Sequence, residues 1–232
     1  MVLGGDRSLS QKALDKMQPH LGLSESEFSY LENLVTLAES ASQDAKLKAL
    51  EKIQRSRTYQ ELNPKEFEVY RYLAHWYYVA IREMAGLPDF KLEPSWIQER
   101  LRGRLSLKEI EEAVSFLIEN NYIELRKDGT AGLPDKDLKC VGGVYRLALA
   151  QFHREMLELA GRSLHEVPVE ERDITGHTFA VPKEKLGEMR KILEEAREKI
   201  AKLSDDRKNS EVFHVALAAF PLTYRKPKKG ES

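Results

Sequence analysis

The 232-residue chain has one cysteine, no long apolar run and almost no net charge, and each absence excludes a class of protein. Because Cys140 is alone, neither a disulfide nor a multi-cysteine zinc site can form within the chain. No apolar stretch approaches the roughly 20 residues of a membrane span, and the first residues lack the basic and hydrophobic regions of a secretion signal. A formal net charge of −1 gives no overall attraction to nucleic acid or to anionic membranes. We therefore expect a protein of the cytoplasm.

The sequence also lacks the residue spacings that mark common catalytic and cofactor sites. Its 6 histidines include no HExxH pair, its glycines form no GxGxxG or GxxxxGK[ST] loop, and no serine lies in a GxSxG turn. His177 and His214 fall on two segments that we expect to pair as strands, with Asp173 nearby. A metal or acid–base site needs further groups at that point. We therefore expect no enzyme, no metal and no cofactor.

The most informative pattern is in residues 94–147, which follow the order helix, tight turn, helix, strand, loop and strand of winged-helix domains. A short helix starts at Pro94 and ends at Gly103. The capping-box pattern of Ser106 and Glu109 starts a second helix. The apolar face of this helix repeats at helical spacing and consists of Leu107, Ile110, Val114 and Leu117. The second helix would be the recognition helix of a DNA-binding winged helix.

Two strands complete the expected winged unit. The second helix ends at Asn120–Asn121, and the first strand follows at Tyr122–Leu125. A polar loop containing Gly129 and Gly132 would form the wing, and Val144–Leu149 would return as the second strand.

The helix expected over residues 66–86, which would be the first helix of the winged unit, is rich in aromatic residues. Residues 66–86 carry aromatic and aliphatic side chains three or four apart, which predicts a single helix. Such aromatics also occur as base-stacking platforms. Their helical spacing next to aliphatic residues favours the interpretation that they belong to the core.

The expected recognition helix has the wrong charge for DNA. Four glutamates, Glu109, Glu111, Glu112 and Glu119, stand against Lys108 alone. DNA-binding proteins gain affinity by neutralising phosphates, so this helix would be repelled from the groove. Two interpretations stay open: the wing and the N-terminal helix contact DNA, or the unit serves as a packing and partner-binding module.

The first sixty residues predict three helices. The first begins at Ser8 or Ser10 and ends by Gly22, and the second begins with the capping box of Ser24 and Glu27. The third covers Gln43–Arg55, after which Thr58–Pro64 is a polar hinge.

The last part of the chain predicts a strand, a long helix and a second strand. After a helix over Gln151–Ser163, strands are expected in the second half of 171–181 and over 211–220, because β-branched and aromatic residues are frequent there. The helix between them runs from Pro182 to about Ser204 with a heptad seam that predicts a helix–helix or dimer contact. The residues expected at this contact are Leu186, Met189, Leu193 and Ile200.

Together these patterns predict an α+β fold that is mostly helical. We expect a helical N-terminal region over 1–57, a winged-helix-like domain over 64–149, a C-terminal strand–helix–strand unit over 150–224, and a basic tail over 225–232.

Several motifs in combination resemble an uncharacterised bacterial family. The matching segments are Leu21–Ser24, Tyr30–Val35, His75–Tyr78, 171–181 and Val212–Thr223. Members of that family carry a domain-of-unknown-function label, occur as multiple paralogues, and are often regarded as transcriptional regulators because many begin with a lambda-repressor-like helix-turn-helix. Here Val2–Ser10 resembles only the end of that domain. The resemblance implies a regulatory protein in which most of the DNA-reading domain either lies before the start of this sequence or has been lost.

Two functions follow as hypotheses. A winged-helix regulator would contact DNA through cations of the N-terminal helix and the wing, and would form a dimer. The cations expected at DNA are Arg7, Lys12, Arg126, Lys127, Lys136 and Lys139. Alternatively, an adaptor without DNA binding would dock a basic protein partner through Glu109, Glu111 and Glu112 of the acidic helix.

Overall fold

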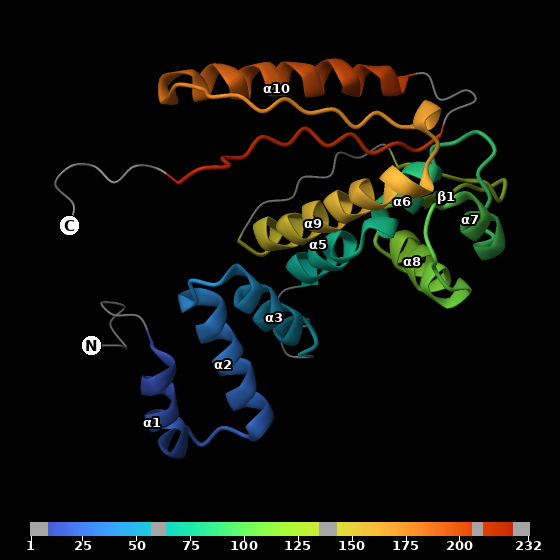
Figure 1. The fold of residues 1–232 in the computed structure, drawn as a ribbon. Helices are drawn as coiled ribbons and strands as arrows, with labels where there is room; N and C mark the ends of the chain where they lie inside the picture. Colours follow the sequence, from blue (N-terminus) through green and yellow to red (C-terminus); the bar gives the residue numbers. More distant parts are fainter. Residues whose placement is uncertain (1–8, 57–63, 135–142, 206–210, 225–232) are drawn as a thin grey trace.

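The computed structural model describes residues 9–56, 64–134, 143–205 and 211–224, and Figure 1 shows their arrangement. The described part of the chain is mostly helical and contains a single two-stranded sheet. No helix within it is both long and apolar enough to cross a membrane. The helical content is confirmed, whereas the β part is much smaller than the sequence predicts.

Three helices form the N-terminal region, as expected. They are α1 (Gln11–Leu21), α2 (Glu25–Glu39) and α3 (Gln43–Gln54). The side chains of Ser10, Ser24 and Ser42 accept hydrogen bonds from the first turns of these helices, and the capping box at Ser24 is complete. Leu14, Phe28 and Val35 form a small apolar cluster of their own. The expected hinge, 58–64, lies outside the described residues except for Pro64.

The expected single helix over 66–86 is wrong, because the chain forms two helices that meet at His75. These are α5 (Pro64–Ala74) and α6 (Trp76–Met84). His75 has extended backbone angles, φ −139° and ψ 134°, and precedes the first residue of α6. The break is possible because a side chain from a distant helix accepts the Trp76 N–H, as described below. The aromatic residues do belong to the core, since Tyr77 and Tyr78 are buried.

The next two helices follow the sequence expectation closely. They are α7 (Pro94–Arg100) and α8 (Leu107–Glu119). The capping box of α8 is complete: Ser106 accepts from the Glu109 N–H, and Glu109 accepts from the Ser106 N–H. Its buried face is formed by Ile110, Ala113, Val114, Phe116 and Leu117. α8 ends at Asn120, and Asn121 takes the left-handed conformation with φ 58°.

A short hairpin follows α8. Strands β1 (Glu124–Leu125) and β2 (Ala131–Gly132) are antiparallel, with Glu124 opposite Gly132. The expected returning strand at 144–149 is wrong: these residues lie in the long helix α9 (Gly143–Glu166), of which the expected helix over 151–163 is the second half. Ala148 and Phe152 fall four residues apart and are both buried, so helical periodicity prevails over local strand propensity.

The main core joins α5, α6, α7, α8 and the first half of α9. Its largest fully buried side chains include Tyr122, Ile81, Ile97, Ile110 and Leu117. Tyr72 stacks on Tyr122 with ring centroids 4.3 Å apart. Because this core links residues from 72 to 152, the middle region and the start of α9 fold as one unit.

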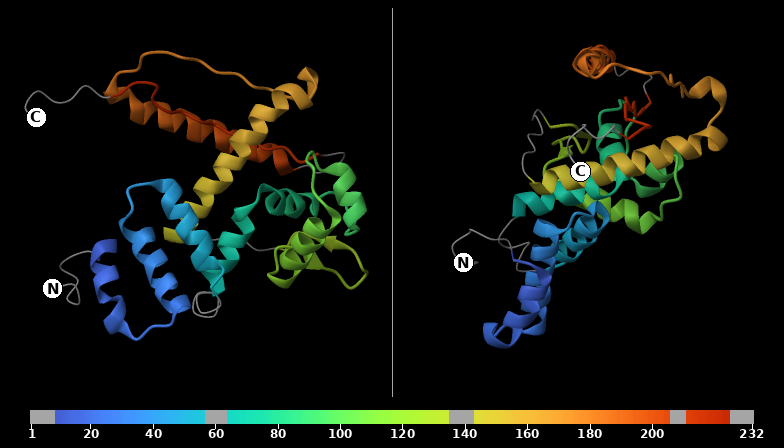
Figure 2. Two further views of the ribbon diagram at one scale, coloured as in Figure 1. Left: turned by 60° about the horizontal axis from the view of Figure 1, so that its bottom comes forward. Right: turned by 60° about the vertical axis from the view of Figure 1, so that its left-hand side comes forward.

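The C-terminal region contains the expected long helix but not the expected strands. Helix α10 (Leu186–Ala201) lies between the 3₁₀ turns η3 (Lys183–Lys185) and η4 (Lys202–Asp205), and a further 3₁₀ turn, η2, covers Val169–Glu171. Residues 173–181 and 211–220 are in no sheet, so the strand–helix–strand prediction is wrong for this single chain. A strand needs a hydrogen-bonding partner, and these two segments do not supply one to each other. Figure 2 shows them as extended chain alongside α10.

We expect a matched pair of glycine substitutions to have opposite effects on stability. A Cβ at Gly103, between α7 and α8, would lie 2.9 Å from the Trp76 ring, whereas a Cβ at Gly161 in α9 would meet nothing within 4 Å. Gly103→Ala should therefore destabilise the protein by about 1–3 kcal/mol through overpacking. Gly161→Ala should stabilise it by roughly 0.5–1 kcal/mol because alanine favours helix. Urea unfolding measures both, and equal effects would contradict the tight packing of Trp76.

Candidate functional site

The outer face of α8 is acidic and exposed. Glu111, Glu112 and Glu119 are exposed, and Lys108 lies 3.8 Å from Glu112. Glu109 is also exposed, but both Ser106 donors bind its carboxylate, at 2.8 Å from the backbone N and 2.7 Å from Oγ. These hydrogen bonds, the backbone one first, lower the pKa of Glu109. Glu109 therefore maintains the helix start, and the acidic surface consists of the other three glutamates.

The hairpin presents two cations at its turn. Arg126 and Lys127 are both exposed. The turn is closed by the Arg126 N–H, which donates to the Thr130 carbonyl at 2.8 Å, and by Asp128, which accepts from the Thr130 hydroxyl at 2.7 Å. That hydroxyl and the Thr130 N–H lower the pKa of Asp128. Gly129 has φ 83°, a conformation that suits glycine. The turn is thus locally fixed, and both cations are exposed, with the Arg126 guanidinium beside Gly132 of β2.

A second group of cations lies in the turn between α7 and α8, and our sequence interpretation missed it. Arg100, Arg102 and Arg104 alternate along this turn. Arg100 binds Asp89 at 3.1 Å and lies over the Trp96 ring at 4.9 Å. Arg102 binds Glu171, while Arg104 is exposed. The alternating arginines next to a predicted helix-turn-helix turn are a signal that could have revealed them.

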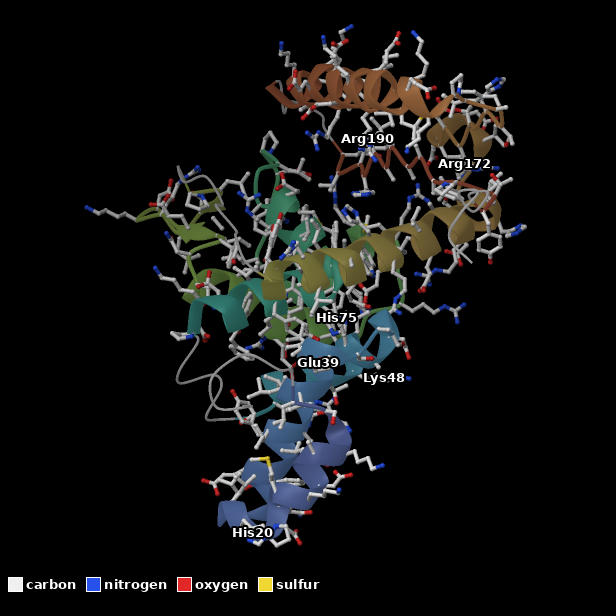
Figure 3. The ribbon with its side chains drawn as sticks, turned by 90° about the vertical axis from the view of Figure 1, so that its left-hand side faces the viewer. His20, Glu39, Lys48, His75, Arg172 and Arg190 are labelled. Carbon is white, nitrogen blue, oxygen red and sulfur yellow. The ribbon has the colours of Figure 1, made fainter. Side chains whose placement is uncertain are left out.

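The break at His75 is held by one carboxylate from α9. Glu155 Oε2 accepts the Trp76 N–H at 2.8 Å, and Glu155 Oε1 lies 3.5 Å from His75 Nδ1. Gln151, one turn earlier in α9, donates to the same Oε1 at 3.4 Å. Figure 3 shows His75 near the place where α3 approaches α9. The carboxylate thus supplies the N-cap that the His75 side chain does not provide.

The contact between His75 and Glu155 shifts the pKa of both side chains. The hydrogen bond with Glu155 raises the pKa of His75, although partial burial opposes this. Burial alone would raise the pKa of Glu155, but hydrogen bonds from His75 and the Trp76 N–H lower it overall. Both shifts favour the charged pair. The contacts of this carboxylate are those of a helix cap.

Comparison with known families identifies most of the chain. The model of a family described as a domain of unknown function, DUF4423, matches residues 53–222. The chain belongs to this family. No curated protein matches the chain, and no solved structure matches it. The DUF4423 match begins within α3 and spans the core, the acidic helix, the hairpin and α10.

Within this DUF4423 chain, the structure separates the residues that we expected to act together at DNA. Lys12 is exposed on α1, in the N-terminal cluster, whereas Arg126 and Lys127 lie at the hairpin. Arg7, Lys136 and Lys139 lie outside the described residues.

The expected meeting of His177 and His214 is not formed. His177 packs on Phe179, while His214 contacts the edge of Phe152 in α9 with ring centroids 5.8 Å apart. Burial, followed by the neighbouring charge of His153, lowers the pKa of His214. Across the described ranges, no group of three or more His, Cys, Asp or Glu side chains is placed to hold a metal ion.

The residues expected at a dimer contact lie along one side of α10. Leu186, Met189, Leu193 and Ile200 are all partly exposed, and α10 has no buried residue. The seam predicted from the heptad spacing is therefore not covered fully by the rest of the chain.

Removal of the Glu155 carboxylate should destabilise the fold. Glu155→Ala leaves the Trp76 N–H without its acceptor, which costs about 1–2 kcal/mol. Glu155→Gln keeps an acceptor and should retain most of that stability. Glu158→Ala, an exposed change on the same helix, is the control and should stay within about 0.5 kcal/mol of wild type. Chemical unfolding at pH 6 measures all three, and equal loss in Glu155→Ala and Glu158→Ala would contradict the cap.

The same pair predicts a defined pH dependence. The raised pKa of His75 contributes stability below its ordinary value of 6.5, which is lost as the pH rises through the raised value. The lowered pKa of Glu155 contributes stability above its ordinary value of 4.5, and this stability is lost as the pH falls through the lowered value. The stability difference between wild type and Glu155→Gln should thus be largest between these two values and smaller at pH 8. The effect is modest because His75 is half exposed. A difference that grows above pH 7 would contradict it.

Proposed function

We propose that this DUF4423 protein is a regulatory protein whose middle region is a winged-helix domain. The observation that carries the proposal is the order of elements: α6, α7 and α8 pack together, and a hairpin follows α8 directly. This is the helix-turn-helix-and-wing order of DNA-reading domains, with β2 rather than 144–149 as the returning strand. The resemblance to proteins regarded as transcriptional regulators supports the same assignment.

The charge distribution determines how such a domain would meet DNA. With Glu111, Glu112 and Glu119 exposed, α8 does not enter the major groove, because each carboxylate would be held near phosphates without compensation. The cations available nearby are Arg126 and Lys127 at the hairpin and Arg104 in the turn before α8. We propose that these residues contact phosphates, with Lys12 as a contact from the N-terminal helices. Contacts of this kind position a protein on DNA but carry little sequence information.

A dimer fits this function. Regulators of this kind commonly bind two half-sites with two-fold symmetry. The seam of α10 is the surface we propose for self-association, because its apolar residues are only partly covered within one chain.

DNA retention, titrated with salt, tests the regulator proposal. The wild-type chain should retain fragmented genomic DNA at low salt, with affinity falling steeply as salt rises. Arg126→Ala with Lys127→Ala should weaken retention for all fragments and reduce the slope of log affinity against log salt by about 2. Lys52→Ala with Arg55→Ala removes the same charges from α3 and is the matched control. Unchanged retention in the hairpin variant, or no retention by wild type, would contradict the proposal.

A second candidate function is an adaptor that does not bind DNA. The specific observation in its favour is the exposed acidic face of α8, which suits a basic protein segment. Oligolysine peptide is a defined probe of this face. Changing Glu111, Glu112 and Glu119 to Lys should reduce peptide affinity at least tenfold, whereas changing Glu194, Glu195 and Glu198 of α10 to Lys should not. Glu109 is left intact, so that the capping box and the fold are preserved. Equal loss in both variants would exclude a specific acidic site.

A further inference from the structure

The C-terminal third of the chain has apolar residues but no core. No residue after Phe152 whose side chain is described is buried. Large apolar side chains in the two extended segments are exposed instead: Ile174, Phe179, Val212, Phe213, Val215, Leu217, Phe220 and Leu222, at between 39% and 73%. Exposed large apolar side chains in this number are unusual on a monomer and indicate an interaction site.

The backbone of the same segments is also not paired with other backbone within the described residues. Residues 173–181 and 211–224 form no backbone–backbone hydrogen bond with any part of the chain that the structure describes. Both sequences have strong strand preference, with Thr178, Phe179 and Val181 in one and Val212, Phe213 and Val215 in the other. Extended chain with this composition and open edges is a template for pairing with another strand.

The second segment has the pattern of a strand at the centre of a sheet. Its alternate residues form two faces, and both are apolar apart from His214 and the first residue, Glu211. On one face His214 contacts Phe152 of α9, but Val212 and Phe220 are exposed. The opposite face, with Phe213, Val215 and Leu217, is exposed as well. A strand that is buried on both faces reads as a nearly continuous apolar run, which is the pattern here.

The segments are held in a defined position rather than left free. Arg172 donates to the carbonyls of Val167 and Leu164 at the end of α9, at 3.0 and 3.3 Å, and so fixes the turn into the first segment. Figures 2 and 3 show residues 211–224 lying between α9 and α10.

We propose that a second copy of this chain completes the structure, through a sheet to which each copy contributes 173–181 and 211–220. The 211–220 strands of the two copies pair antiparallel about a two-fold axis at the centre of the shared sheet. The seam of α10 covers one face of this sheet. The proposal deepens the dimer contact suggested above for α10, but it does not depend on DNA binding.

A second copy fits this surface better than a charged partner does. Between Asp173 and Val181, and between Glu211 and Phe220, histidine is the only further titratable residue, so neither segment selects for charge. In an antiparallel pair, the strand edge of one copy can form hydrogen bonds with the same edge of the second copy, as two-fold symmetry requires. The eight exposed apolar side chains offer on the order of 900 Å² per chain, comparable to the roughly 800 Å² per partner of a stable interface.

The charges of α10 argue against a simple helix pair as the interface. If Leu186 and Leu193 occupy the a positions of the heptads, the flanking e positions are Arg190 and Arg197, and the g positions are Ile192 and Lys199. Two such helices would bring cations together along the seam, without the acidic partners that stabilise coiled coils. The seam therefore packs on the shared sheet.

Light scattering of the full chain at tens of micromolar tests the proposal. Wild type should have twice the mass of one chain, and Val215→Asp should reduce it to the mass of one chain. Leu107→Asp is the control: Leu107 has similar exposure, 45% against 51%, and aspartate is tolerated in the first turn of a helix. This variant should remain a dimer.

Helical circular dichroism checks that Val215→Asp still folds, because Val215 does not belong to the main core. A wild-type monomer, or a dimer that survives both Val215→Asp and Phe213→Asp, would overturn the proposal. DNA retention by the monomeric variant is a separate readout. Loss or survival of DNA retention tests the regulator proposal, whereas the mass measured by light scattering tests the shared sheet.

Discussion

The carboxylate of Glu155 is the contact on which the arrangement of the middle region depends. It caps α6 through the Trp76 N–H and faces His75, so it fixes where α5 ends and α6 begins. Because Glu155 lies three residues after the buried Phe152, it also fixes α9 against the core. Trp76 in turn packs against Gly103, in the turn that precedes α8. The Glu155 carboxylate thus links the helix break at His75, the long helix α9 and the turn before α8 in the proposed winged unit.

Helix α9 connects a part of the molecule that has a buried core with a part whose described residues are not buried. Its first half contributes Ala148 and Phe152 to the main core, whereas its second half is exposed at Leu157 and Leu164. The segments that follow are extended, apolar and unpaired. We infer that the first part folds on its own contacts, while the second part acquires its core from a second chain. The proposed regulatory unit would then be symmetric, with two hairpins at its surface.

The sequence allowed prediction of features that depend on neighbouring residues. The capping boxes at Ser24 and Ser106, the end of α8 at Asn120 and the presence of α10 are correct, because each is encoded in the local sequence. The acidic face of α8 and the exposed cations of the hairpin also followed from local pattern. The fold class was correct only in being mostly helical.

The features that failed depend on distant contacts. The break at His75 requires Glu155, which lies far along the chain, so helical spacing over 66–86 gave no sign of it. Residues 144–149 have both strand propensity and helical spacing, and only the burial of Ala148 decides between them. The strand character of 211–220 is real in the sequence, but a strand needs a partner that one chain does not provide. Arg104 was missed although it alternates with Arg100 and Arg102, because the sequence interpretation assigned the DNA contacts to the N-terminal helix and the wing.

Hydrogen exchange of the backbone amides in 211–220 tests the central claim most directly. In wild type at tens of micromolar, these amides should exchange slowly, comparably to buried α8, because they would bond across the shared sheet. Dilution below the dimer's dissociation constant should release them while α8 stays protected. Rapid exchange at every concentration, with α8 protected throughout, would contradict the claim that a second copy completes the fold.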